Sequence, residues 1–194
     1  DTLQHYLSAD GTDVMIDEKC PDFNTIDRVS LVACGTAYYA CLTAKYWFEQ
    51  VAGLPADVDI ASEFRYREPP IPDRTLTVFV SQSGETADTL AALRYSLEKS
   101  TTLAVINVAE SSIAREAKVA LPIYAGTEIG VASTKAFTCQ LVVLLVLALK
   151  AARDRGTLPD ADFADAVSAL RGLPSLMSRV LDQKIGRASC RERV

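Results

Sequence analysis

The sequence is poor in the residues that build metal centres and aromatic surfaces. Its 194 residues include one histidine, His5, one tryptophan and only 7% aromatic side chains. The five cysteines form no CxxC pair and show no other spacing typical of zinc ligands. Structural zinc sites need four cysteine or histidine ligands at regular spacing. The sequence therefore argues against a bound metal, and we expect no cofactor.

Basic residues are too few for an electropositive face. Lysine and arginine total 20 against 25 acidic residues, which gives a net charge of −5 and an isoelectric point of about 5.0. Nucleic acids and anionic membranes select basic surfaces. We expect neither as a partner.

The sequence shows no signal peptide and no long hydrophobic run. Its most apolar stretch, residues 141–149, is far too short to cross a bilayer, so we expect a buried helix there. Cys34, Cys41 and Cys139 lie in apolar segments, as reduced buried thiols do. This cysteine usage predicts a cytoplasmic protein.

The overall composition, with 49% hydrophobic and 23% charged residues, is that of one globular domain with appendages. We expect an N-terminal approach segment at 1–27 and one domain at 28–183. The last residues, 184–194 (KIGRASCRERV), are basic in an acidic chain and have no apolar face. They resemble translated cloning sequence, and we leave them out of the fold.

The apolar pattern predicts strands that alternate with helices. The strands are expected at 29–33, 57–61, 76–80, 102–108 and 119–124. Helices are expected at 2–8, 37–51, 85–99, 111–117, 134–155 and 160–182, the last with a bend at Pro174. Residues 63–73 contain three prolines and are predicted to be a loop.

Alternation of this kind implies right-handed βαβ units and a parallel sheet covered on both faces. We predict a three-layer α/β/α sandwich with five parallel strands in the flavodoxin-like order 2-1-3-4-5. In such a sheet the ligand lies at the carboxyl ends of strands 1 and 3, where the strand order reverses.

The most informative segment, residues 76–86 (LTVFVSQSGET), joins a strand to a helix through small hydroxyl residues. A helix N-terminus attracts phosphate through its unpaired N–H groups and partial positive charge. Ser81, Ser83 and Thr86 add hydroxyl donors. No Walker lysine follows, so this is no nucleoside triphosphate loop. A plain helix cap at Ser83 is the alternative interpretation.

Two further turns have the same character. One is 34–37 after the first strand, and the other is 126–135 after the fifth. All three turns should meet at one edge of the sheet and form a polar cleft for a sugar phosphate. The alternatives stay open at each: the first could be a simple turn, and Glu128 and Lys135 could be a solvated charge pair or helix-end charges.

Several motifs together resemble a known family. These are CGT at 34–36, YWFE at 46–49, ASEFRYRE at 61–68, SQSGETADTL at 81–90 and AGTEIGVASTKAFT at 125–138. In this order they are similar to the first sugar isomerase (SIS) domain of the glutamine–fructose-6-phosphate aminotransferases, or glucosamine-6-phosphate synthases. The resemblance covers residues 29–182.

The resemblance implies a set of sugar-phosphate-binding residues. Those in the turn after the third strand would hold the phosphate. Thr36 and the backbone around Cys34 and Gly35 would contact the sugar, residues 131–133 would line the sugar side, and Lys135 would support its loop. Many relatives have serine where this chain has Ala37, which removes one hydroxyl. The set is Cys34, Gly35, Thr36, Ala37, Ser81, Gln82, Ser83, Thr86, Val131, Ala132, Ser133 and Lys135.

In the family, a glutaminase domain supplies ammonia to a synthase portion made of two SIS domains. The catalytic glutamate, histidine and lysine of that portion lie outside the first SIS domain. The resemblance therefore implies that this chain binds fructose 6-phosphate or glucosamine 6-phosphate and is inactive alone. We also expect a homodimer, through residues 141–149 and the aromatic residues of 38–48. A sugar-phosphate-sensing module of a regulator and a one-domain phosphosugar isomerase are the alternatives.

Overall fold

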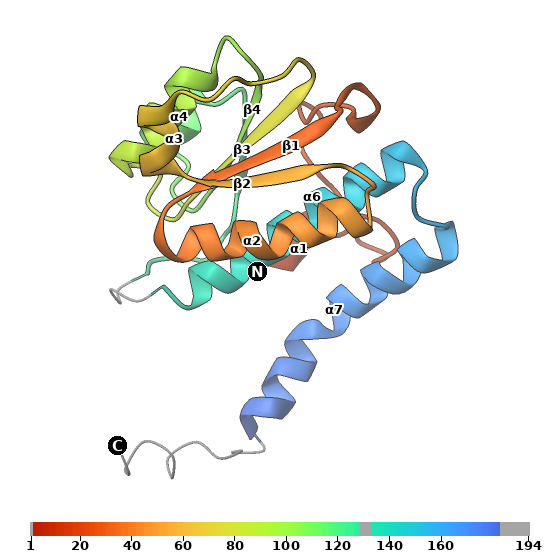
Figure 1. Ribbon diagram of the computed structural model, residues 1–194. Coiled ribbons are helices and arrows are strands. Elements are labelled where there is room, and N and C mark those ends of the chain that lie inside the picture. Colours follow the sequence, from red (N-terminus) through yellow and green to blue (C-terminus); the bar gives the residue numbers. More distant parts are fainter. Residues whose placement is uncertain (1, 129–132, 183–194) are drawn as a thin grey trace, which may run out of the picture.

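A computed structural model describes residues 2–128 and 133–182 of the chain. Its sheet contains five parallel strands in the order β2-β1-β3-β4-β5. Figure 1 shows this sheet with helices on both sides, so the predicted fold class and strand order are confirmed. The strands are β1 (Arg28–Ala33), β2 (Ala56–Ile60), β3 (Thr75–Ser81), β4 (Thr101–Ile106) and β5 (Val119–Pro122).

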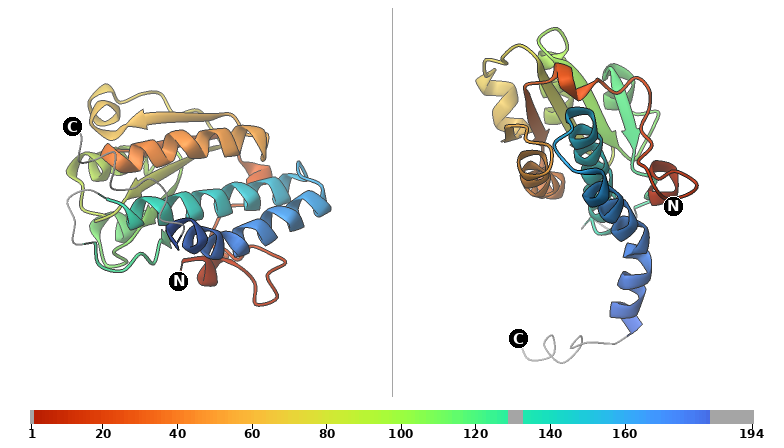
Figure 2. Two further views of the ribbon diagram at one scale, coloured as in Figure 1. Left: turned by 90° about the horizontal axis from the view of Figure 1, so that it is seen from below. Right: turned by 90° about the vertical axis from the view of Figure 1, so that its right-hand side faces the viewer.

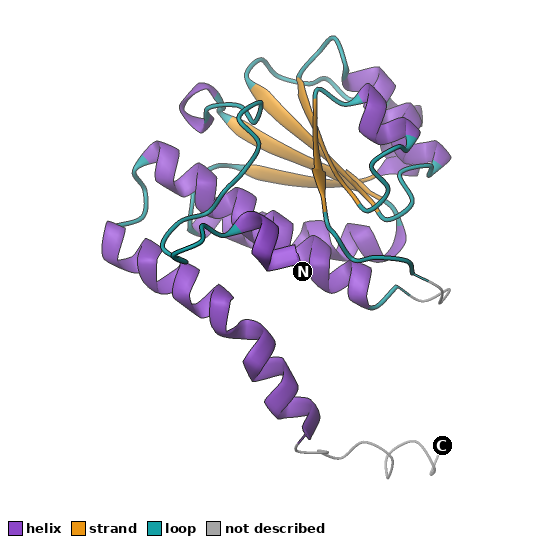
Figure 3. Cartoon of the chain, turned by 180° about the vertical axis from the view of Figure 1, so that it is seen from behind, coloured by secondary structure: helices purple, strands orange, loops and turns teal. Residues whose placement is uncertain are grey.

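The helices fall in the connections between strands, as crossovers of parallel strands require. Figure 3 shows the sheet between its two helical layers. The helices, with one short 3₁₀ turn, are α1 (Thr2–Tyr6), η1 (Phe23–Thr25), α2 (Gly35–Gln50), α3 (Ala61–Arg67), α4 (Ala87–Ser96), α5 (Ser112–Glu116), α6 (Lys135–Arg155) and α7 (Asp160–Asp182).

The strands are apolar on both faces because each face meets a separate hydrophobic cluster. In β3, Val78 and Val80 point to the cluster formed with α2 and α6. Phe79 points the opposite way, to the cluster formed with α3, α4 and α5. Side chains alternate along a strand, so an uninterrupted apolar run is what a sheet buried on both faces requires.

Helix α6 is long and apolar enough to cross a membrane by length and composition alone. Most of it is buried against the sheet and α2, including Val143, Leu144 and Leu147. The expected buried helix is therefore observed, although the element is longer than the run 141–149. Burial also makes that run a poor dimer surface, which corrects the contact predicted from it.

The largest local error of the sequence analysis lies in the segment predicted as the loop 63–73. Residues Ala61–Arg67 form α3, which ends at Glu68 in the left-handed conformation with φ 45°. The three prolines follow this cap and do not enter the helix, so they terminate α3 and leave it intact. Arg65 ties α3 to α4 through an ion pair with Asp88 at 2.8 Å.

Helix α7 extends away from the body of the domain (Figure 2). It runs continuously through Pro174. Phe163, Val167 and Leu170 at its start are buried, whereas its far half exposes large apolar side chains. These are Leu176, Met177, Val180 and Leu181, which we call the α7 apolar end.

Burial on α2 gives a direct test of this fold. Phe48 is fully buried between α2 and the rest of its cluster, so Phe48→Ala should lower the free energy of unfolding by about 3–5 kcal/mol. Tyr46 on the same helix is 59% exposed, and Tyr46→Ala should change stability by no more than about 0.5 kcal/mol. Urea denaturation of both variants measures the difference, and equal losses would contradict the observed packing of α2.

Candidate sugar-phosphate site

The turn after β3 is held together by its own hydroxyl groups. Ser81 Oγ accepts a hydrogen bond from the Gly84 N–H at 3.0 Å and lies 3.1 Å from Thr86 Oγ1. Ser83 Oγ accepts from the Glu85 N–H at 3.2 Å. Ser81 is buried and braces the turn, whereas Ser83 is exposed, so its hydroxyl hydrogen can still be donated to a ligand.

Gly84 fixes how closely this turn approaches the next loop. Its φ is +67°, and a Cβ built on it would lie 2.0 Å from Ser111 Oγ. The Gly84 carbonyl also accepts a hydrogen bond from the Ile113 N–H at 3.1 Å. Only glycine combines this backbone conformation with this lack of space.

Glu85 serves a different helix from the one it precedes. A carboxylate just before α4 would ordinarily act as a charge at the start of that helix. Its carboxylate instead accepts a hydrogen bond from the Ser112 N–H at 2.7 Å, at the start of α5. That bond lowers the pKa of Glu85 below its usual value. Glu85 therefore anchors the turn and is no free carboxylate at the site.

The three predicted turns meet at one cavity of about 230 Å³. It lies where β1 and β3 are neighbours, at the reversal of strand order. Its lining consists of Cys34, Thr36, Ala37, Val80, Ser81, Gln82, Ser83, Thr86, Glu128, Ser133 and Gln140. Gly35 and Lys135 are not part of this wall as the described residues form it, and their predicted roles stay predictions. Val131 and Ala132 lie outside the described residues.

Helix N-termini are the groups that this cavity could present to an anion. Thr36 and Ala37 belong to the first turn of α2, Thr86 precedes α4, and Ser133 precedes α6. No lysine or arginine is part of the wall formed by the described residues. Three partial positive charges and several hydroxyl groups thus face one small volume, which suits a phosphate.

Two polar atoms of the wall have no hydrogen-bond partner among the described residues. They are Ser133 Oγ and Gln140 Oε1, and Gln140 is only 1% exposed. Buried polar groups are almost always paired, so both atoms suit a polar ligand. Gln140 was not predicted as a site residue because it lies in an apolar helix. Its position in the second turn of α6 was the only signal in the sequence that could have pointed to it.

The charged residues after β5 secure the loop to α6. Glu128 Oε2 accepts a hydrogen bond from the Ala136 N–H at 3.0 Å, in the first turn of α6. Lys135 Nζ contacts the carbonyl oxygen of Thr127. Each residue thus has a backbone partner, so they are not a solvated charge pair, and Glu128 acts as a helix-end charge at the start of α6.

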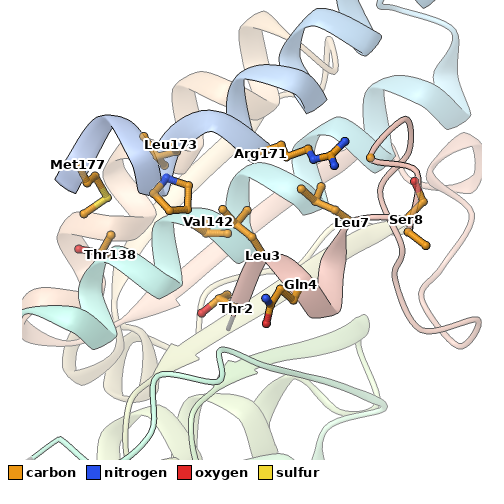
Figure 4. Close-up of a pocket in the computed structure, with 13 residues that line it drawn as sticks. Thr2, Leu3, Gln4, Leu7, Ser8, Thr138, Val142, Arg171, Leu173 and Met177 are labelled. Carbon is orange, nitrogen blue, oxygen red and sulfur yellow. The ribbon is translucent and has the colours of Figure 1, made fainter. Parts of the chain in front are cut away.

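A larger cavity, of about 600 Å³, lies elsewhere, between α1, α6 and α7. Figure 4 shows Leu3, Leu7 and Val142 facing it beside Leu173 and Met177. The wall of this cavity is mainly apolar, and its cationic side chain, Arg171, already donates to the Asp10 carbonyl oxygen at 3.1 Å. The polar cavity at the sheet edge is therefore the candidate substrate site.

The cysteines of the described ranges are all free. Burial raises the pKa of the Cys20 thiol to about 12 and raises that of Cys41 still further. Neither thiol can form a nucleophilic thiolate near neutral pH. Within residues 2–128 and 133–182 no group of three metal-ligating side chains comes together.

Comparison with known proteins identifies the class. The model of the SIS domain family matches residues 23–150, and the chain belongs to this family. Among curated proteins it is 55% identical to a glutamine–fructose-6-phosphate aminotransferase [isomerizing] of Bradyrhizobium diazoefficiens, over 93% of this chain and 30% of that protein. A protein of the same name from Bartonella quintana is 51% identical over 99% of this chain and 32% of its own length.

Solved structures agree with this class. The C-terminal domain of glucosamine-fructose-6-phosphate aminotransferase from Francisella tularensis is 42% identical, with a TM-score of 0.88 over 93% of this chain and 51% of that one. A putative phosphosugar isomerase from Silicibacter pomeroyi is 30% identical, with a TM-score of 0.67 over 79% of this chain and 45% of that one. The chain spans about a third of the length of the curated relatives.

Gly84 provides a test of the turn that forms the site. Gly84→Ala should destabilise the fold more than Gly126→Ala, because both glycines have positive φ but only the first meets another side chain. We expect about 1–3 kcal/mol of backbone strain in each variant and an additional loss for Gly84→Ala. Adding Ser111→Gly should recover part of that additional loss. Equal unfolding free energies for the two single variants would contradict the close contact with Ser111.

Proposed function

We propose that this chain is the first SIS domain of a glutamine–fructose-6-phosphate aminotransferase. That enzyme converts fructose 6-phosphate and glutamine to glucosamine 6-phosphate and glutamate. The observation that carries the proposal is the convergence of the N-termini of α2, α4 and α6 on one polar cavity. The similarity to named aminotransferases over nearly the whole chain supports it.

In this proposal the turn after β3 binds the phosphate. Ser83 and Thr86 donate hydroxyl hydrogens, and backbone N–H groups at the start of α4 complete the cradle. The sugar hydroxyls lie against Thr36, Ser133 and Gln140. The last two supply the unpaired polar atoms of the opposite wall. The described wall of the cavity offers no aromatic side chain for stacking a base, which favours a sugar phosphate over a nucleotide.

We assign binding, and no proton transfer, to the chain by itself. Interconversion of a ketose and an aldose needs a base within reach of a carbon-bound proton. Glu128 is the only carboxylate in the described wall, and it accepts a hydrogen bond from Ala136. The residues that carry out the chemistry would come from other parts of the full enzyme.

Two other functions compete with this proposal. A one-domain phosphosugar isomerase would need its own acid and base, yet His5 stacks on Tyr124 at 3.7 Å and is no part of the cavity wall. A sugar-phosphate-sensing module of a regulator would use the same cavity without catalysis. The higher identity to aminotransferases, 55% against 30% for the isomerase structure, favours the first proposal.

We further propose a cytoplasmic protein that assembles as a homodimer, and a second SIS domain and a glutaminase domain as partners within the full enzyme. Exposed Tyr39 and Tyr46 on α2 and the α7 apolar end are the surfaces that support assembly. Exposed apolar side chains gathered on one element are typical of an interface.

Calorimetric titration with fructose 6-phosphate tests the binding site. Wild type should bind, and Ser83→Ala should weaken binding about tenfold or more, because a hydrogen bond to a charged group contributes about 1.5–3 kcal/mol. Ser175→Ala, a change at an exposed serine of α7, is the matched control and should bind as wild type does. Equal affinity for Ser83→Ala and wild type would remove Ser83 from the cradle, and no binding by wild type would overturn the proposed function.

Light scattering at rising protein concentration tests self-association. The isolated chain should form dimers through the α7 apolar end, and replacing Val180 and Leu181 together by aspartate should give a monomer. Tyr66→Asp alters a residue that is 78% exposed on α3 and should leave association unchanged. A wild-type chain that stays monomeric throughout would contradict this part of the proposal.

A further inference from the structure

Asn107 connects two walls of the cavity although it does not line it. It follows the last residue of β4, between the turn after β3 and the loop after β5. Its backbone N–H donates to the Gln82 carbonyl oxygen at 3.2 Å. Its side-chain Oδ1 accepts from the Ala125 N–H at 2.9 Å, and its Nδ2 donates to the Gly126 carbonyl oxygen at 2.7 Å. We call these three hydrogen bonds the Asn107 bridge.

The two ends of the Asn107 bridge belong to opposite sides of the site. Gln82 is part of the cavity wall on the phosphate side. Gly126 precedes Glu128, which belongs to the wall on the other side. A change in the Asn107 bridge therefore alters the separation of two loops that would hold the same ligand.

The chemistry of the bridge requires a carboxamide. One end of the side chain must accept a hydrogen bond from the Ala125 N–H while the other donates one to the Gly126 carbonyl oxygen. Aspartate keeps the acceptor but, when ionised, has no hydrogen to donate. It would then place a negative oxygen against the Gly126 carbonyl oxygen, an unfavourable contact.

The start of the same loop is held independently by α1. Thr2 Oγ1 donates to the Ile123 carbonyl oxygen and Tyr6 OH donates to that of Pro122, each at 2.7 Å. Tyr124 then takes φ +52°, so the chain changes direction between this anchor and the bridge. Asn107 therefore decides where residues 125–126 lie once residues 122–123 are fixed.

We propose that Asn107 is a positioning residue for sugar-phosphate binding: it sets the separation between the turn after β3 and the loop after β5. This inference rests on the proposed function. It assigns Asn107 no contact with the ligand, and its effect is transmitted through Gln82 and through residues 125–128.

Titration of fructose 6-phosphate into wild type, Asn107→Asp and Asn24→Asp tests the proposal. Asn24 Nδ2 also donates to a backbone carbonyl oxygen, that of Asp154, at 2.7 Å, so Asn24→Asp removes a comparable donor far from the site. At pH 8 we expect Asn107→Asp to bind about tenfold more weakly than wild type. We expect Asn24→Asp to bind as wild type does.

The pH dependence of that deficit follows the charge of the introduced carboxylate. An aspartate carboxyl ordinarily titrates near pH 3.9, so the deficit of Asn107→Asp relative to wild type should stay constant from pH 8 to pH 6, where the introduced carboxylate has no hydrogen to donate to Gly126. The titratable groups that share the neighbouring surface are His5, Glu110, Tyr124 and Glu128. They are present in both proteins, and the ratio of affinities at each pH removes their contribution.

Hydrogen exchange at the Ala125 amide gives a second measurement that needs no ligand. Asn107→Ala removes the acceptor of this N–H and should accelerate its exchange at least tenfold, while Asn107→Asp keeps the acceptor and should largely preserve protection. If wild type binds fructose 6-phosphate and Asn107→Asp binds it equally well at pH 8, this inference alone is overturned. Protection of the Ala125 amide that is unchanged in Asn107→Ala would overturn it as well. A wild type that does not bind would overturn the proposed function and this inference with it.

Discussion

The reversal of strand order at β1 is the constraint on which the rest of the structure depends. Because β1 has β2 on one side and β3 on the other, the helices after β1 and β3 leave the sheet toward opposite faces. Their first turns separate at the carboxyl edge and leave a space between them. The cavity with Thr36 and Ser83 in its wall occupies that space. The site is thus a product of topology before any side chain is specified.

The groups around this space then make it suitable for a phosphate, although no lysine or arginine belongs to its described wall. Three helix N-termini supply partial positive charge, and the hydroxyl groups of Ser83 and Thr86 add short-range donors. The contact of Gly84 with Ser111 and the bond from Ser112 to Glu85 brace the turn against α5. Backbone groups held rigidly in this way bind an anion with little reorganisation, whereas long cationic side chains would first have to be ordered.

Sequence reasoning could predict the layers, the strand order and the three turns, because apolar runs and small hydroxyl residues are local signals. It could not find α3, where prolines beyond the helix resemble prolines within it. It also missed Gln140 and Asn107, whose importance arises from contacts distant in sequence. It ended β4 at residue 108, whereas the strand ends at Ile106 and the side chain of Asn107 takes over the bonding to the next loop. The roles of the predicted site residues stay predictions.

A crystal structure of the chain with fructose 6-phosphate tests the central claim most directly. The account predicts the phosphate within hydrogen-bond distance of Ser83 and the backbone N–H groups before α4, with the sugar between Thr36 and Gln140. A sugar phosphate bound in the cavity between α1, α6 and α7, with the cavity at the carboxyl ends of β1 and β3 left empty, would contradict it.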